Sequence, residues 1–116
     1  MNDIDELFAN QTLELRRGTI VLAILSCLKT PLYGYGLLQT LEQSGIAVDA
    51  GTLYPLLRRL EKQGVLESNW NTDEQRPRKF YQLSPQGTKL YDRLVEEWSQ
   101  TNEKLQVMIK QGESHE

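Results

Sequence analysis

The chain has 116 residues, of which 39% are apolar and 25% charged, and its formal net charge is −3 at pH 7, values ordinary for a soluble globular protein of one domain. The longest apolar run, residues 19–28, is shorter than the ~20 residues of a membrane span, and the acidic N-terminus lacks the basic-then-apolar order of a secretory signal. The single cysteine, Cys27, cannot form an intramolecular disulfide, so we expect a cytoplasmic protein with no membrane partner.

The charge is unevenly distributed along the chain. Residues 1–14 carry four acidic side chains and no Lys or Arg, whereas residues 15–83 carry nine basic and six acidic side chains. Residues 84–116 are acidic again, with four basic and six acidic side chains. A basic middle between acidic ends leaves a nucleic-acid partner open despite the negative total.

The apolar pattern predicts three helices in the first half of the chain. The first runs over 13–28, largely buried, and ends before Pro31. A short second helix lies in 33–45, with Leu37, Leu38 and Leu41 inward and Gly45 as its stop, and a third covers most of 50–63 before Gly64.

A hairpin and a long helix complete the predicted order. The stretches "VLESNW" (65–70) and "KFYQL" (79–83) are strand-like and flank the polar loop "NTDEQRPR". Ser84 can cap the last helix and Pro85 suits its first position, so that helix is expected to reach about residue 111. The order is typical of a winged helix-turn-helix with a two-stranded wing, over 1–83, followed by a C-terminal helix and tail, 84–116.

The third helix separates an apolar face from a basic one. Leu53, Leu56, Leu57 and Leu60 share one side by helical spacing, with Tyr54 at its edge. The opposite side carries Thr52, Pro55, Arg58, Arg59 and Lys62. Such a face suits a DNA major groove, where Arg and Lys pair with phosphates or guanine edges, although any amphipathic helix has a solvated charged side.

The start of this helix stays open at the sequence level. Asp49 would cap an early start, in which case Pro55 would lie inside the helix at a cost. A later start at Gly51 or Thr52 would place Pro55 nearer the first turn.

Two further features favour DNA as the partner. The segment "QRPRK" places Arg76, Arg78 and Lys79 at the hairpin tip, where a wing meets the DNA backbone or minor groove. Tyr33 and Tyr35 stand at the start of the second helix, a common place for phosphate contacts, although a buried role for one of them fits equally well.

Three motifs then resemble the PadR family of transcriptional regulators. They are "YGYGL" at 33–37, "GTLYPLLRRLEKQGVLES" at 51–68 and "RPRKFYQLSPQG" at 76–87, with Phe80 and Ser84 where that family usually has Tyr and Thr. The resemblance implies a bacterial homodimeric repressor that binds double-stranded DNA at an inverted repeat. It implies that the DNA-contacting residues of the recognition helix are Thr52, Tyr54, Pro55, Arg58, Arg59 and Lys62. Tyr35 matches the Gly-Tyr start of the second helix, and Arg76, Arg78 and Lys79 match the wing. The length places the chain in the small subfamily with a single C-terminal helix.

The last helix predicts dimerisation from its own pattern. A heptad seam repeats at intervals of three and four residues, formed by Tyr91, Leu94, Trp98, Thr101, Leu105 and Met108. Val95, Asn102 and Ile109 form a second row. One compact domain leaves little surface to cover both rows, so a partner chain is the simplest solution, with folding back onto its own core as the alternative.

Trp98 lies in the middle of this stripe, where interface packing is its ordinary role. Some small PadR members bind flat drug-like molecules between paired Trp side chains at the dimer centre. That resemblance implies an aromatic or hydrophobic effector beside Trp98, with Ile20 and Ile24 as walls and Val95 and Asn102 nearby. A multidrug response would follow.

The sequence gives no sign of an enzyme, a cofactor or a metal. The only histidine, His115, stands next to the C-terminus, so no catalytic or metal-binding residues are expected. The competing interpretation is a winged helix used as a protein-interaction or drug-binding dimer without a specific DNA target.

Overall fold

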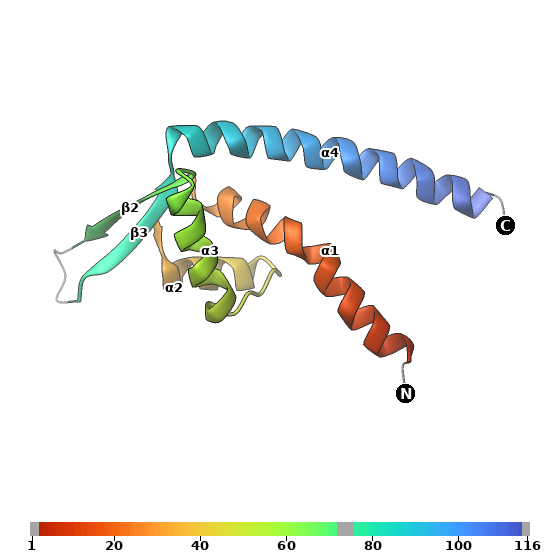
Figure 1. The fold of residues 1–116 in the computed structure, drawn as a ribbon, viewed down its shortest axis with the longest axis horizontal. Helices are drawn as coiled ribbons and strands as arrows, with labels where there is room; N and C mark the ends of the chain where they lie inside the picture. The colour runs from red at the N-terminus through yellow and green to blue at the C-terminus, as the bar shows by residue number, and fades with distance from the viewer. Residues whose placement is uncertain (1–2, 72–75, 115–116) are drawn as a thin grey trace.

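A computed structural model describes residues 3–71 and 76–114 and shows a winged unit from which two long helices project (Figure 1). In chain order the elements are α1 (Ile4–Cys27), β1 (Leu32–Tyr33), α2 (Gly34–Gln43), α3 (Ala50–Lys62), β2 (Leu66–Asn71), β3 (Arg78–Leu83) and α4 (Pro85–Ser114). The mostly helical fold with a hairpin wing and a long last helix confirms the predicted class.

The sheet has three strands, one more than the sequence predicts. Its order is β1-β3-β2, and both pairings are antiparallel. Leu32 lies opposite Tyr81 and Tyr33 opposite Phe80, so the segment assigned to the start of the second helix first pairs with the wing. This pairing fixes the N-terminus of α2 against β3.

α1 differs most from its prediction. It begins at Ile4, nine residues before the expected start, where the Asp3 carboxylate accepts a hydrogen bond of 2.9 Å from the Glu6 amide. Only Ile24 and Leu25 within the helix are buried. The expectation of a largely buried helix is therefore wrong, because α1 packs into the domain only near its C-terminal end.

The core lies where the end of α1, the apolar faces of α2 and α3, and the sheet meet. Glycines at positive φ close the two shorter helices, Gly45 (φ +87°) after α2 and Gly64 (φ +81°) after α3, as predicted. The buried apolar residues are Ile24, Leu25, Leu28, Leu37, Leu41, Leu53, Leu57, Leu60, Val65, Leu66 and Tyr81.

α4 starts at a tightly bonded junction with the wing. The Ser84 hydroxyl accepts from the Gly87 amide at 2.9 Å, which confirms the predicted cap, and donates to the Gly64 carbonyl at 2.6 Å. From there α4 runs away from the wing on the same side as the N-terminal half of α1 (Figure 1), and the molecule extends over 63 × 38 × 24 Å.

Candidate DNA-binding face and effector hollow

α3 presents the basic face that the sequence predicts. Leu53, Leu57 and Leu60 are buried and Leu56 is half-buried. The exposed side chains are Thr52, Pro55, Arg58, Arg59 and Lys62. Three cations therefore stand on one open side of a helix whose other side is fixed in the core.

The earlier of the two predicted starts of α3 is the observed one. The Asp49 carboxylate accepts from the Thr52 amide at 2.7 Å, and hydrogen bonding from Thr52 lowers the pKa of Asp49 below its usual range. Pro55 lies inside the helix, and the hydrogen bond that it cannot donate would reach Gly51, in the first turn. The helix continues past it without a break.

Tyr54 connects α3 to the beginning of α2. A Cβ added at Gly34 would lie 2.7 Å from the Tyr54 hydroxyl oxygen, so the two helices approach as closely as glycine permits. Tyr54 is half-buried there. Its ring serves packing, and its hydroxyl lies at the edge of the hollow described next.

A hollow of about 560 Å³ separates the wing from the start of α2. It brings together six of the residues predicted to contact DNA. Its lining comprises Tyr33, Gly34, Tyr35, Tyr54, Arg76, Arg78, Lys79 and Tyr81. Tyrosine hydroxyls and guanidinium groups are typical donors to DNA phosphates.

The two tyrosines at the start of α2 lie in different surroundings. Tyr33 is half-buried and packs edge-on against Phe80, with ring centroids 5.6 Å apart. Tyr35 is 57% exposed and stacks on Tyr33 at 6.5 Å. One tyrosine therefore packs and the other faces outward, which matches the alternative left open by the sequence.

The three wing cations are not equivalent. Arg76 is exposed, whereas the Arg78 guanidinium lies 4.6 Å from the centre of the Tyr33 ring. Lys79 donates to Glu61 Oε1 at 3.1 Å. Arg78 and Lys79 belong to β3 rather than to the tip, whose residues 72–75 lie outside the described part of the chain.

Glu61 is a residue that sequence reasoning missed as a participant. It accepts hydrogen bonds from Ser68 on β2 and Lys79 on β3. The hydrogen bond from the Ser68 hydroxyl holds the pKa of Glu61 below its usual value; burial opposes this by a smaller amount, and the Lys79 ammonium lowers the pKa further. The sequence showed only an acid among cations, since its partners are 7 and 18 residues away.

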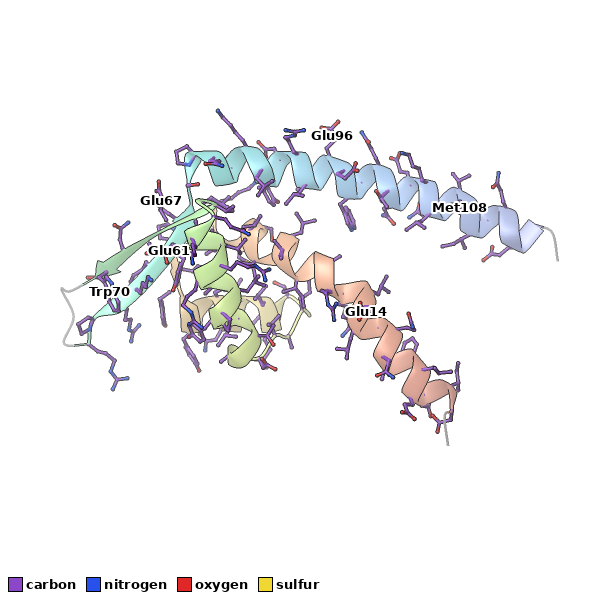
Figure 2. The ribbon with its side chains drawn as sticks, viewed as in Figure 1. Glu14, Glu61, Glu67, Trp70, Glu96 and Met108 are labelled. Atoms are coloured by element: carbon purple, nitrogen blue, oxygen red, sulfur yellow. The ribbon has the colours of Figure 1, made fainter. Side chains whose placement is uncertain are left out.

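The predicted seam of α4 is open along its outer half. Trp98 is 49% exposed, Leu105 49% and Met108 64%, and Thr101 is also exposed. Tyr91 and Leu94, nearer the winged unit, pack against the core. Figure 2 shows Met108 on the part of α4 that stands clear of the other elements.

The N-terminal half of α1 carries a comparable set of exposed apolar side chains, which the sequence reasoning did not single out. Ile4, Phe8 and Leu15 are each at least 70% exposed. Asp3 followed by Glu6 is the capping signal that could have indicated this early helix start.

Two adjoining hollows, of about 450 and 310 Å³, lie between α1 and α4 beside Trp98. Both are lined by Thr19, Leu22 and Trp98, and Val95 lines the smaller one. Of the predicted walls, Ile24 is fully buried in the core and Ile20 packs against it, and neither lines these two hollows. Asn102 is half-buried and lines neither hollow.

Signs of other chemistry are weak in the described residues. Burial raises the pKa of the Cys27 thiol, which favours the unreactive protonated form. Within residues 3–71 and 76–114 no three His, Cys, Asp or Glu side chains could hold a metal ion, and no helix is long and apolar enough to cross a membrane. His115, on which the sequence argument against an enzyme relied, lies outside the described residues.

Several known proteins are similar to this chain in sequence and in fold. A transcriptional regulator of Mycobacterium tuberculosis is 37% identical over 75 residues, which cover 64% of this chain and 70% of that protein. A PadR family transcriptional regulator from Eggerthella lenta is 39% identical with a TM-score of 0.85, covering 90% of this chain and 94% of that one. A transcriptional regulator from Clostridium thermocellum is 30% identical with a TM-score of 0.70, covering 79% and 91%.

The family model for PadR-like transcriptional regulators matches residues 21–93, which include the end of α1, the whole winged unit and the start of α4. Regulators of this family are non-enzymatic DNA-binding proteins and are generally dimeric. The match spans more than half of the chain, and the two solved structures share its fold. The chain therefore belongs to the PadR-like family of transcriptional regulators.

Proposed function

We propose that this regulator is a homodimeric repressor that binds an inverted-repeat operator through α3 and the wing. The observation that carries the proposal is the open face of α3, where Arg58, Arg59 and Lys62 are exposed while the one acid of the helix, Glu61, is paired with the wing. A helix whose cations are exposed to solvent and whose single acidic side chain is paired with another residue is suited to bind a polyanion such as DNA.

In this arrangement α3 enters the major groove. Arg58, Arg59 and Lys62 pair with phosphates or guanine edges, and Thr52 and Pro55 approach the bases. The hollow beside the wing takes the DNA backbone, with Tyr35 and Arg76 as its exposed donors and Tyr54 at its edge. Tyr33 and Arg78 support that hollow through their stacked contact.

A second copy of the chain would place two such faces side by side. The exposed seam on α4 and the exposed apolar residues of α1 supply a surface for it, and dimerisation is general in the family. Two half-sites one helical turn apart require about 34 Å between the recognition helices, which an inverted repeat and a twofold dimer satisfy together.

The test is a titration of labelled DNA from upstream of the protein's own gene, with random duplex as control, at several salt concentrations. Replacing Arg58 and Arg59 with Ala should weaken binding by about 10- to 100-fold and lower the salt slope by about two. The matched control replaces Lys89 and Arg93, two exposed cations of α4, and should leave the slope unchanged. Equal slopes in both variants would contradict DNA recognition by α3 and favour a protein partner.

Release by a flat hydrophobic molecule is a second part of the proposal, and the hollows beside Trp98 support it. A ligand in these hollows would press α1 and α4 apart and change the distance between the two α3 helices of the dimer. It would shift the equilibrium between the two arrangements only by the difference in its affinity for them. A planar aromatic dye should lose about tenfold or more in affinity when Trp98 is replaced with Ala. Replacing Trp70, the exposed tryptophan of the wing, should not change dye affinity. Equal dye affinity in the Trp98 variant would remove this part.

A further inference from the structure

One carboxylate ties the recognition helix to both strands of the wing. Glu61 stands one position before the end of α3, and its two oxygens accept from different strands. Ser68 of β2 donates to Oε2, and Lys79 of β3 donates to Oε1 at 3.1 Å. Figure 2 shows Glu61 on the part of α3 that lies beside the base of the wing.

The Lys79 ammonium is surrounded by protein groups, of which Glu61 is one. Its ammonium also lies 5.2 Å from the centre of the Tyr81 ring, and its side chain is 30% exposed, against 32% for Glu61. Tyr81 stands opposite Ser68 in the sheet. Ser68 of β2 and Lys79 of β3 can therefore both reach Glu61 of α3, which connects the three elements. Lys79 is therefore directed at protein groups, in contrast to exposed Arg76 at the end of the same segment.

We infer that Glu61 is a positioning residue for DNA binding, which fixes the angle between the recognition helix and the wing, and that Lys79 serves this contact in place of a DNA phosphate. The inference rests on the proposed DNA-binding function. The hollow between α2 and the wing includes Lys79 in its wall, so a change in wing angle would change its width and the position of Arg76 relative to α3.

The sign of one substitution separates this role from simple electrostatics. An acid beside a basic DNA-binding face repels phosphates, so Glu61→Gln should strengthen DNA binding if Glu61 acts only through its charge. If Glu61 positions the wing, the same variant should weaken binding by about threefold, the scale of a partly exposed ion pair. The two accounts predict opposite changes.

Lys79→Met and Lys62→Met form the matched pair. Lys62 is the exposed neighbour of Glu61, so its loss should lower the salt slope by about one. Lys79→Met should weaken binding about as much as Glu61→Gln, with the slope unchanged, and the double variant should be no weaker than either single one. A salt slope lowered by one in Lys79→Met, or tighter binding by Glu61→Gln, would overturn the inference.

Hydrogen exchange of the β2 and β3 amides in the free protein gives an independent measurement. Exchange should rise in Glu61→Gln and Lys79→Met and remain at the wild-type rate in Lys62→Met. If the wild type shows no salt-dependent DNA binding, the proposed function fails. Hydrogen exchange in the free protein then still tests whether Glu61 holds the wing against α3. Equal wing exchange in the Glu61→Gln and Lys62→Met variants would then refute it.

Discussion

The winged unit and the projecting helices differ in how they treat their apolar side chains. In the winged unit most leucines of α2 and α3 are buried, and both helices end on glycine turns whose amides bond to carbonyls of the last turn. Along the outer halves of α1 and α4, large apolar residues such as Phe8 and Met108 stand 64–70% exposed. The first region encloses its apolar side chains within one chain, whereas the second leaves a row of them exposed.

The strongest way to break this comparison is to charge the seam of α4. Replacing Leu105 and Met108 with Lys should raise the dimer dissociation constant by at least about 100-fold, close to 3 kcal/mol, because two charges would be placed in an apolar interface. The winged unit should keep its secondary structure. Sedimentation at a series of concentrations measures the effect.

Val107 offers the matched control for the seam. It lies on the same stretch of α4 and is 56% exposed, but helical spacing places it on the opposite side from Leu105. Val107→Lys should therefore leave the dissociation constant within about threefold of wild type. Equal dissociation by the control would show that the seam is not the interface.

The junction between the two regions gives the next largest effect. A methyl group at Gly87 would overlap the Val65 carbonyl oxygen, so Gly87→Ala must push the first turn of α4 away from β2. We expect a loss of about 2 kcal/mol in the free energy of unfolding, measured by urea titration. Gly112→Ala, in the same helix with open space around it, should raise stability or leave it unchanged, since alanine favours helices.

Sequence reasoning succeeded where local signals and long-range packing agree. The end and the buried side of α3 agree with the prediction, because Gly64 follows the helix and Leu53, Leu57 and Leu60 are buried, whereas the choice between its two possible starts needed the observed Asp49 cap. β1 was missed because two residues carry no periodicity, and their strand exists only through pairing with β3. The predicted walls beside Trp98 stay a prediction, because they belong to a dimer centre that one chain does not form by itself.

Glu61 and Lys79 show the same limit at the candidate DNA-binding face. Both carry charges that a sequence identifies, but only the register of the hairpin brings Lys79 to α3. Reading Lys79 as a DNA contact followed from its neighbours Arg76 and Arg78. In the structure Lys79 is paired with Glu61 and Arg78 lies over the Tyr33 ring, whereas Arg76 is exposed, so the three wing cations have different surroundings.

The smallest expected effect is the change in stability at acid pH, and it tests the Glu61 contact between α3 and the wing directly. The folded protein lowers the pKa of Glu61 below its usual 4.5, chiefly through Ser68, so the stabilisation is present above pH 4.5 and is lost as pH falls through the lower folded value. The stability difference between wild type and Glu61→Gln should therefore stay constant from pH 7 to 5 and shrink in more acid solution, by less than about 1 kcal/mol. Ser68→Ala should raise the Glu61 pKa, followed by NMR of its carboxyl carbon, and move this loss to higher pH. A Glu61 pKa unchanged in the Ser68 variant would mean that β2 is not held by α3 through this carboxylate, and only Lys79 of β3 would then connect the wing to Glu61.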